Sequence, residues 1–170
     1  MRYVLIAVLI LMTAVLGCTP APQNDIVPDQ DNSAIDATAD EGSYEQGTWT
    51  EDWDLALSAA EKLNRPVLVN FTGSDWCSWC IRLASEVFSK DEFNTYAKDN
   101  LVLLKLDFPR KLQQSMELKE QNETRMRQFG VEGFPTIVLV DSEGKEINRT
   151  GYQPGGAAKY IEHLQALLAK

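Results

Sequence analysis

The sequence predicts an α/β domain over residues 48–170, built on a central mixed sheet of about four strands flanked by helices. Two observations support this. Segments with apolar residues at helical spacing alternate with short apolar runs typical of buried strands, which indicates helices packed on both faces of a sheet. The first two strand segments are joined through helices and should be parallel, whereas the last two are joined only by a turn and should form an antiparallel hairpin.

Apolar spacing and end signals place the helices. The first carries Trp53, Ala56 and Ala60 on one face and ends at the Asn64-Arg65-Pro66 stop. The second carries Cys80, Leu83 and Val87, and the pattern Ser89-x-x-Glu92 predicts a capping box that opens the third. A polar stretch then leads into a fourth helix that ends at Gly130. The helices are expected near residues 53–63, 77–88, 89–97, 122–129 and 157–170.

The strands are predicted from apolar runs bounded by turn residues. Residues 67–71, 101–108 and 136–140 read as buried strands, and Pro109 closes the second of them. The turn Asp141-Ser142-Glu143-Gly144 leads into a fourth strand near 145–150.

The N-terminal residues 1–17 are predicted to be a signal peptide. Arg2 precedes an apolar stretch from Tyr3 to Leu16, which as a helix would be about 21 Å long, short of the ~30 Å hydrocarbon core of a bilayer. The segment ends in Val15-Leu16-Gly17-Cys18, which resembles the lipobox of bacterial lipoproteins. The resemblance implies that Cys18 is lipidated and becomes the mature N-terminus. Ordinary signal cleavage near Gly17, leaving a free thiol, is the alternative.

Residues 18–47 are predicted to be an acidic, disordered tether that begins at the lipidated cysteine. From residue 19 onward they combine seven acidic residues with Pro, Gln, Asn, Ser and Ala, and they contain no Lys or Arg. Such a segment cannot bury enough apolar surface to become ordered. The whole chain carries a formal net charge of −9, and it has no basic stripe. This composition argues against nucleic acid as a partner.

Cys77 and Cys80 form a C-x-x-C pair directly after the first predicted strand, which indicates a redox couple. If the helix begins at or just after Cys77, its sulfur faces free backbone N–H groups and the positive end of the helix dipole. Both stabilise a thiolate, so Cys77 is the predicted nucleophile and Cys80 the resolving thiol. A static structural disulfide is the alternative. Zinc needs four ligands and only His163 could join the pair, so we expect no metal.

The strand, the Trp76-Cys-x-x-Cys motif and the later Gly133-Phe134-Pro135-Thr136 together resemble the thioredoxin family over about residues 48–170, and most of all its bacterial extracytoplasmic members. The resemblance implies a thioredoxin fold with no cofactor. It also implies that Pro135 is cis and faces the cysteines, and that Phe134 pairs through its backbone with the substrate. Trp76 would shape the rim of the site. From sequence alone, Pro135 could also be a trans proline at a strand entry, and Trp76 a core residue.

Asn70 is a departure from the family pattern. Many thioredoxins have a buried Asp at the matching position, which takes part in proton transfer with the resolving thiol, and an amide cannot exchange a proton in this way. Asp107 and Glu86 are the candidate replacements, although either could be a structurally paired acid. Asp75 is expected to cap its own turn, and the basic residues at 110, 111, 125 and 127 to form a solvated face.

The sequence therefore predicts an extracytoplasmic thiol–disulfide oxidoreductase, lipid-anchored to a bacterial membrane, that reduces or isomerises disulfides of exported proteins through a dithiol–disulfide cycle of Cys77 and Cys80. Reduction or isomerisation would require a membrane thiol electron donor, and oxidation an acceptor. A redox-inactive thioredoxin-fold module that binds polypeptides is the alternative. A copper-binding thiol protein is disfavoured because no suitably placed His or Met is present.

Overall fold

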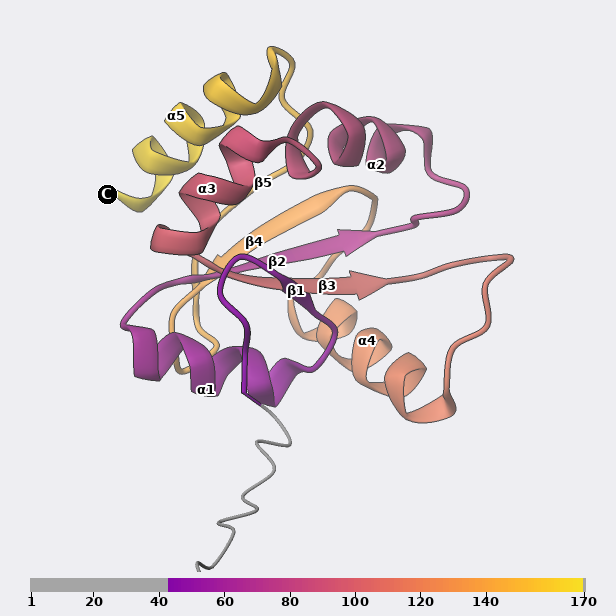
Figure 1. Ribbon diagram of the computed structural model, residues 1–170. Helices are drawn as coiled ribbons and strands as arrows, with labels where there is room; N and C mark the ends of the chain where they lie inside the picture. The colour runs from indigo at the N-terminus through magenta and orange to yellow at the C-terminus, as the bar shows by residue number, and fades with distance from the viewer. Residues whose placement is uncertain (1–42, 170) are drawn as a thin grey trace, which may run out of the picture. The chain divides into compact units, whose positions relative to one another are not determined.

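A five-stranded mixed sheet organises residues 43–169, the part of the chain that the computed structural model describes (Figure 1). The strand order is β1-β3-β2-β4-β5. β2 and β3 are parallel, with Asn70 beside Lys105, while β4 is antiparallel to both β2 and β5. The predicted parallel pair and antiparallel hairpin are confirmed. The strands are β1 Trp49–Thr50, β2 Val67–Thr72, β3 Val102–Asp107, β4 Thr136–Val140 and β5 Glu146–Thr150.

The central strand β2 is buried along its whole length because helices cover both faces of the sheet. Its side chains alternate between the two faces. Val67, Val69 and Phe71 contribute to the core on one face, and Leu68 to the core on the other. By the same alternation, Asn70 is directed to the face of Leu68.

Helices α1 (Trp53–Leu63) and α4 (Met116–Gln128) cover the face of Phe71 (Figure 1). α1 begins at Asp52, whose carboxylate accepts a hydrogen bond from the Leu55 N–H at 3.0 Å, and it ends at Asn64 in the left-handed conformation. Pro66 then blocks further helix. α1 buries Trp53 and three alanines, whereas the only buried residue of α4 is the polar Asn122.

The opposite face carries α2 (Ser78–Leu83), a π-helical turn (Ala84–Phe88), α3 (Asp91–Asn100) and α5 (Gly156–Leu168) (Figure 1). Their apolar residues form the second core with Leu68, Leu103, Ile137 and Leu139. This second core holds the helix that carries the cysteines against the sheet.

Three local expectations differ from the structure. A short strand, β1, is added at the sheet edge by parallel pairing of Trp49 with Leu103, and two residues are too few to produce a sequence pattern. The capping box at Ser89 is wrong: α3 begins after Lys90, because the Ser89 hydroxyl donates to the Ser85 carbonyl of the π-helical turn. α4 begins at Met116, within the stretch expected to precede it, because Ser115 caps it by accepting from Leu118 N–H at 3.2 Å.

The contacts of the domain extend into the segment assigned to the tether. The Tyr44 hydroxyl accepts a hydrogen bond from the Leu103 N–H at 2.8 Å and donates one to the Thr48 carbonyl at 2.9 Å. The predicted signal peptide, Cys18 and most of the tether lie outside the described residues. Within residues 43–169, no helix is both long and apolar enough to cross a membrane.

Candidate active site

Cys77 and Cys80 form a disulfide at the start of α2, with their Cα atoms 5.2 Å apart. Cys77 occupies the cap position in an extended conformation, and its Sγ accepts a hydrogen bond from the Cys80 N–H at 3.2 Å. The expected position of Cys77 at the helix start is thus present. Both side chains are largely buried, with 7% of Cys77 and 3% of Cys80 exposed.

The turn before Cys77 depends on Gly73. The Gly73 carbonyl accepts hydrogen bonds from the N–H groups of Trp76 and Cys77 at 3.3 and 2.9 Å. A Cβ atom at Gly73 would lie 2.5 to 2.8 Å from atoms of the Trp76 indole. Only glycine therefore allows the indole to fold back over the turn.

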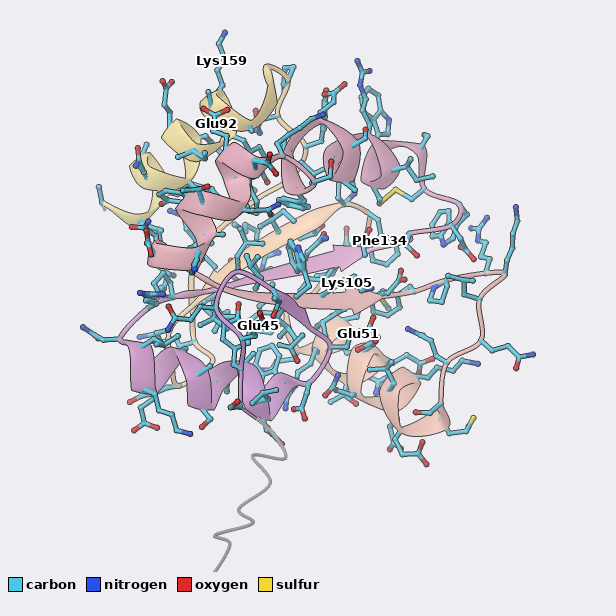
Figure 2. The ribbon with its side chains drawn as sticks, viewed as in Figure 1. Glu45, Glu51, Glu92, Lys105, Phe134 and Lys159 are labelled. Atoms are coloured by element: carbon cyan, nitrogen blue, oxygen red, sulfur yellow. A yellow bond between two sulfur atoms is a disulfide. The ribbon has the colours of Figure 1, made fainter. Side chains whose placement is uncertain are left out.

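The Phe134–Pro135 peptide bond is cis, as the sequence resemblance implied. The Phe134 ring packs edge-on against Trp76 with centroids 5.9 Å apart, and it stacks on Phe108 at 5.1 Å. Figure 2 places Phe134 at the end of the sheet where the disulfide lies. The structure therefore brings Trp76, Phe134 and Pro135 to the same end of the sheet as the disulfide. All three are partly exposed.

The loop after β3 is fastened to the turn that precedes Cys77. The Trp76 Nε1–H donates to the Phe108 carbonyl at 2.8 Å, and the Arg110 guanidinium lies 3.7 Å from the centroid of the Trp76 ring. Arg110 thus does not belong to a purely solvated face. Arg125 likewise lies over an indole ring, 4.3 Å from the centroid of Trp53. It too does not belong to a purely solvated face.

Two carboxylates cross-link the same pair of loops. Asp75 does not cap its own turn: it accepts hydrogen bonds from the backbone N–H groups of Arg110, Lys111 and Leu112 at 2.9, 2.6 and 3.1 Å. These bonds, that from Arg110 most of all, hold the pKa of the Asp75 carboxyl below its usual value. Asp107 accepts from the Ser74 N–H at 2.9 Å and from the Ser74 hydroxyl at 2.5 Å.

Asp107 also anchors α4 through its backbone. Its carbonyl oxygen accepts hydrogen bonds from the side-chain amides of Asn122 at 2.9 Å and Gln114 at 3.2 Å. The Asn122 oxygen in turn accepts from Gln121 at 3.2 Å. This explains why α4 buries a polar residue: it is tied to the strand end beside the active site through hydrogen bonds.

A second aromatic group includes Trp79, which lies between the two cysteines in the sequence. Trp79, half exposed within the C-x-x-C motif, packs against Tyr152 with centroids 5.1 Å apart. The Tyr152 hydroxyl donates to Glu86 at 2.7 Å, and Arg82 forms an ion pair with the same carboxylate at 2.7 Å. The bond from Arg82, followed by that from Tyr152, lowers the pKa of the Glu86 carboxyl. Glu86 therefore serves to hold this exposed group together.

Asn70 is buried beneath the layer of α2, with 7% of its surface exposed. Its Oδ1 has no hydrogen-bond partner among the described residues. This burial agrees with the match of Asn70 to the buried Asp position of the thioredoxin family pattern. The sequence does not reveal that the Asn70 oxygen lacks a hydrogen-bond partner among the described residues.

A family model for a thioredoxin-like domain matches residues 53–166. The chain belongs to the thioredoxin-like family. It is similar to the disulfide bond reductase DsbH of Chlamydia pneumoniae, with 36% identity over 118 residues that cover 69% of this chain and 71% of the relative. It also matches the thiol:disulfide interchange protein DsbD of Yersinia pestis, at 30% identity over 65% of this chain but only 17% of that protein.

The structural comparison agrees with this assignment. The solved structure titled DsbH oxidoreductase superposes with a TM-score of 0.69 at 34% identity, covering 75% of this chain and 88% of that one. The predicted thioredoxin fold is thus confirmed. At the level of enzyme class, the expected thiol–disulfide oxidoreductase is confirmed as well, because this thioredoxin-like domain carries a disulfide-forming Cys-x-x-Cys pair.

Sequence reasoning missed most of the groups that support the cysteines. Tyr152 meets Glu86 across 66 residues, and Asp107 meets Ser74 across 33. The only signal for these contacts would have been the topology itself. The carboxyl end of β3 and the turn after β2 must be neighbours, because the two strands are parallel and adjacent.

Proposed function

We propose that this chain is an extracytoplasmic thiol–disulfide oxidoreductase, held at a bacterial membrane by a lipid on Cys18, that reduces or isomerises disulfides of exported proteins. The observation that carries the proposal is the Cys77–Cys80 disulfide at the start of α2, at the end of the sheet where the cis Phe134–Pro135 bond precedes β4. The reducing direction is supported by the similarity to a protein named a disulfide bond reductase.

In the reductive reaction the Cys77 thiolate attacks one sulfur of a substrate disulfide. That S–S bond breaks, a mixed disulfide with Cys77 forms, and the second substrate sulfur leaves as a thiolate. Cys80 then loses its proton and attacks Cys77 Sγ, which closes the Cys77–Cys80 disulfide and releases the substrate as a dithiol. Two electrons pass to the substrate in each cycle, and a membrane thiol donor must return them.

The environment of Cys77 supports its role as the attacking sulfur. The backbone N–H of Cys80 donates to Cys77 Sγ, and the free N–H groups and dipole of the following helix favour a negative charge at that position. Cys80, which lies one turn further along and is more deeply buried, suits the resolving step.

Trp76, Phe134 and Pro135 are proposed to receive the substrate chain. All three are partly exposed at the end of the sheet where the disulfide lies, and the Phe134 ring packs against those of Trp76 and Phe108. An extended polypeptide could pair with the backbone of Phe134, as β-strand addition requires. For the proton of Cys80, Asp107 and Glu86 remain the proposed acceptors.

An insulin-reduction assay tests the proposal against the alternative of a redox-inactive binding module. Wild type is expected to reduce insulin with a thiol donor, and Cys77→Ser to be inactive. Ser78→Ala, an exposed position within the same motif, is the matched control and should retain activity. Equal activity in Cys77→Ser and wild type would exclude the dithiol mechanism.

Two cellular experiments test the substrate and the anchor. Cys80→Ala cannot resolve the mixed disulfide, so exported proteins should be captured on Cys77 of that variant and not on the double variant with Cys77→Ser. Membrane fractionation and labelling with a fatty-acid analogue should show lipid on wild type and none on Cys18→Ala. A Cys18→Ala protein that still partitions with membranes and carries label would overturn the proposed anchor.

A further inference from the structure

We propose that Asn70 is a positioning residue that favours the reduced enzyme by accepting a hydrogen bond from the Cys80 thiol. The proposal rests on the proposed dithiol–disulfide cycle of Cys77 and Cys80. The observation behind it is a buried side-chain oxygen, Asn70 Oδ1, that lacks a partner within residues 43–169 while the two cysteines are joined as a disulfide. A buried amide oxygen without a partner is costly, so its retention at the centre of the sheet calls for a reason.

The neighbours of Asn70 in the sheet do not supply a donor. Its partner on β4 is the apolar Ile137, and its partner on β3 is Lys105. The Lys105 ammonium is paired with Glu51 at 2.8 Å, and Figure 2 shows these two side chains at the β1 side of the sheet. Neither cross-strand neighbour thus satisfies Asn70 Oδ1, which leaves the helical layer above the sheet as the source of a donor that we consider.

That layer is α2, which runs back over β2 after the turn at Gly73 (Figure 1). Leu83 and Val87 pack in one core with Leu68, and Asn70 is directed to the face of Leu68. Moving from Leu68 to Asn70 advances about 7 Å along the strand. Moving from Val87 or Leu83 back to Cys80 advances about 5–10 Å in the same direction along the helix.

From these two advances we infer that Cys80 lies over Asn70. Cys80 is one of the two buried residues of α2, and only 3% of its surface is exposed. Its burial between the helix and the sheet is what the proposed contact with Asn70 requires.

The redox state decides whether Cys80 can satisfy Asn70. In the disulfide, Cys80 Sγ bears no hydrogen and cannot donate. When a partner dithiol reduces the enzyme, it passes over two electrons and becomes a disulfide, the Cys77–Cys80 bond breaks, and one of its two protons goes to Cys80 and the other to solvent. Cys77 is left as a thiolate, and Cys80 now carries an S–H that can donate to Asn70 Oδ1.

This hydrogen bond forms only in the reduced state and pulls the equilibrium towards the dithiol. Because the amide is uncharged over the physiological range, its contribution does not depend on the ionisation of Asn70. Asn70 is thus a redox-sensitive contact that sets the reduction potential without exchanging a proton.

The test compares the full wild-type chain with Asn70→Leu, an apolar side chain of similar shape, in glutathione redox buffers. Loss of a neutral hydrogen bond should lower the reduced-to-oxidised ratio at equilibrium roughly three- to tenfold, and tenfold corresponds to about 30 mV for a two-electron couple. Leu68→Val, on the same strand face, is the control for a purely structural change. It should leave the ratio within twofold of wild type.

The S–H stretching band of the reduced protein is the second readout. In wild type the band of Cys80, identified by its loss in Cys80→Ala, should lie at the lower frequency of a hydrogen-bonded thiol, and it should rise in Asn70→Leu. If Asn70→Leu does not fold, Asn70→Ala and the wild-type band still decide the matter. An unshifted glutathione equilibrium in Asn70→Leu overturns the assignment. So does a wild-type S–H band at the frequency of a free thiol, which is the result expected if a buried water, and not Cys80, binds Asn70. No exchange with glutathione at all would instead refute the proposed function.

Discussion

Ser74→Ala is expected to destabilise the domain by about 1.5–3 kcal/mol, the usual contribution of a hydrogen bond to a charged group. The substitution removes one of the two bonds that Ser74 makes to Asp107, namely the hydroxyl bond at 2.5 Å, and retains the N–H bond at 2.9 Å. Only 5% of Asp107 is exposed, but Ser74 itself is exposed, so water can replace part of the lost hydroxyl and the cost should lie near the lower end of this range. At about 4 °C per kcal/mol for a domain of this size, the melting temperature should fall by about 6 °C.

The assay is thermal unfolding of the oxidised protein, arranged as a double-mutant cycle with Asp107→Asn. In the Asp107→Asn background, Ser74→Ala should cost less than about 1 kcal/mol, because only a neutral hydrogen bond is then lost. Ser142→Ala, at an exposed serine in the β4–β5 turn, is the matched control and should change stability by less than about 0.5 kcal/mol. An equal cost of Ser74→Ala in both backgrounds would refute the reasoning, since the charge of Asp107 would then play no part.

Three further predictions concern the support of the cysteines. Gly73→Ala should displace the Trp76 indole, because the added Cβ would lie 2.5 Å from the ring. The tryptophan fluorescence emission should change and insulin reduction should slow. If both stay unchanged, the packing of Trp76 on Gly73 is contradicted. Asp75→Asn should lower the melting temperature most at neutral pH. The pKa of Asp75 is lowered, chiefly by the Arg110 N–H, so the stability it gives is full above about pH 4 and is lost as the pH falls through the folded-state pKa. The melting temperatures of Asp75→Asn and wild type should therefore converge in acid. Leu83→Ala, at a side chain with 1% exposure, should cost about 2–5 kcal/mol in both redox states, measured by chemical denaturation, and a loss confined to one state would contradict a purely structural role.

The sheet could be predicted because its strands carry strong local signals. β2 and β4 are continuous apolar runs between turn residues, and the turn at residues 141–144 joins β4 to β5. β1 could not be predicted, since its two residues acquire their structure only by pairing with β3. The sequence pattern places the start of α4 too late, because the contacts of α4 with the strand end are polar and produce no apolar periodicity.

The cysteines could be predicted for a similar reason, and their supporting groups could not. The spacing of Cys77 and Cys80 is itself a local pattern, whereas the bonds of Asp75 and Asp107 join loops that are distant in sequence. The expectation of a solvated face at Arg110 failed because charge predicts exposure but does not reveal that a guanidinium can stack on an indole.

Of the two carboxylates proposed for proton transfer, Asp107 is better placed than Glu86 to accept the proton of the Cys80 thiol. Glu86 is bonded to Arg82 and Tyr152, both of which lower its pKa, so the ionised form is held in place and protonation would break an exposed ion pair. Asp107 is buried at the end of β3, and its side chain is directed to the same face of the sheet as Asn70 and Leu103.

The rate of the resolving step should therefore fall in Asp107→Asn and remain near that of wild type in Glu86→Gln. Single-turnover release of a substrate from the mixed disulfide with Cys77 measures this step. Ser74→Ala removes a hydrogen bond that holds the Asp107 carboxyl in place but keeps the carboxyl itself, so it should slow the step less than Asp107→Asn does. Equal rates in Asp107→Asn, Glu86→Gln and wild type would exclude both carboxylates as acceptors.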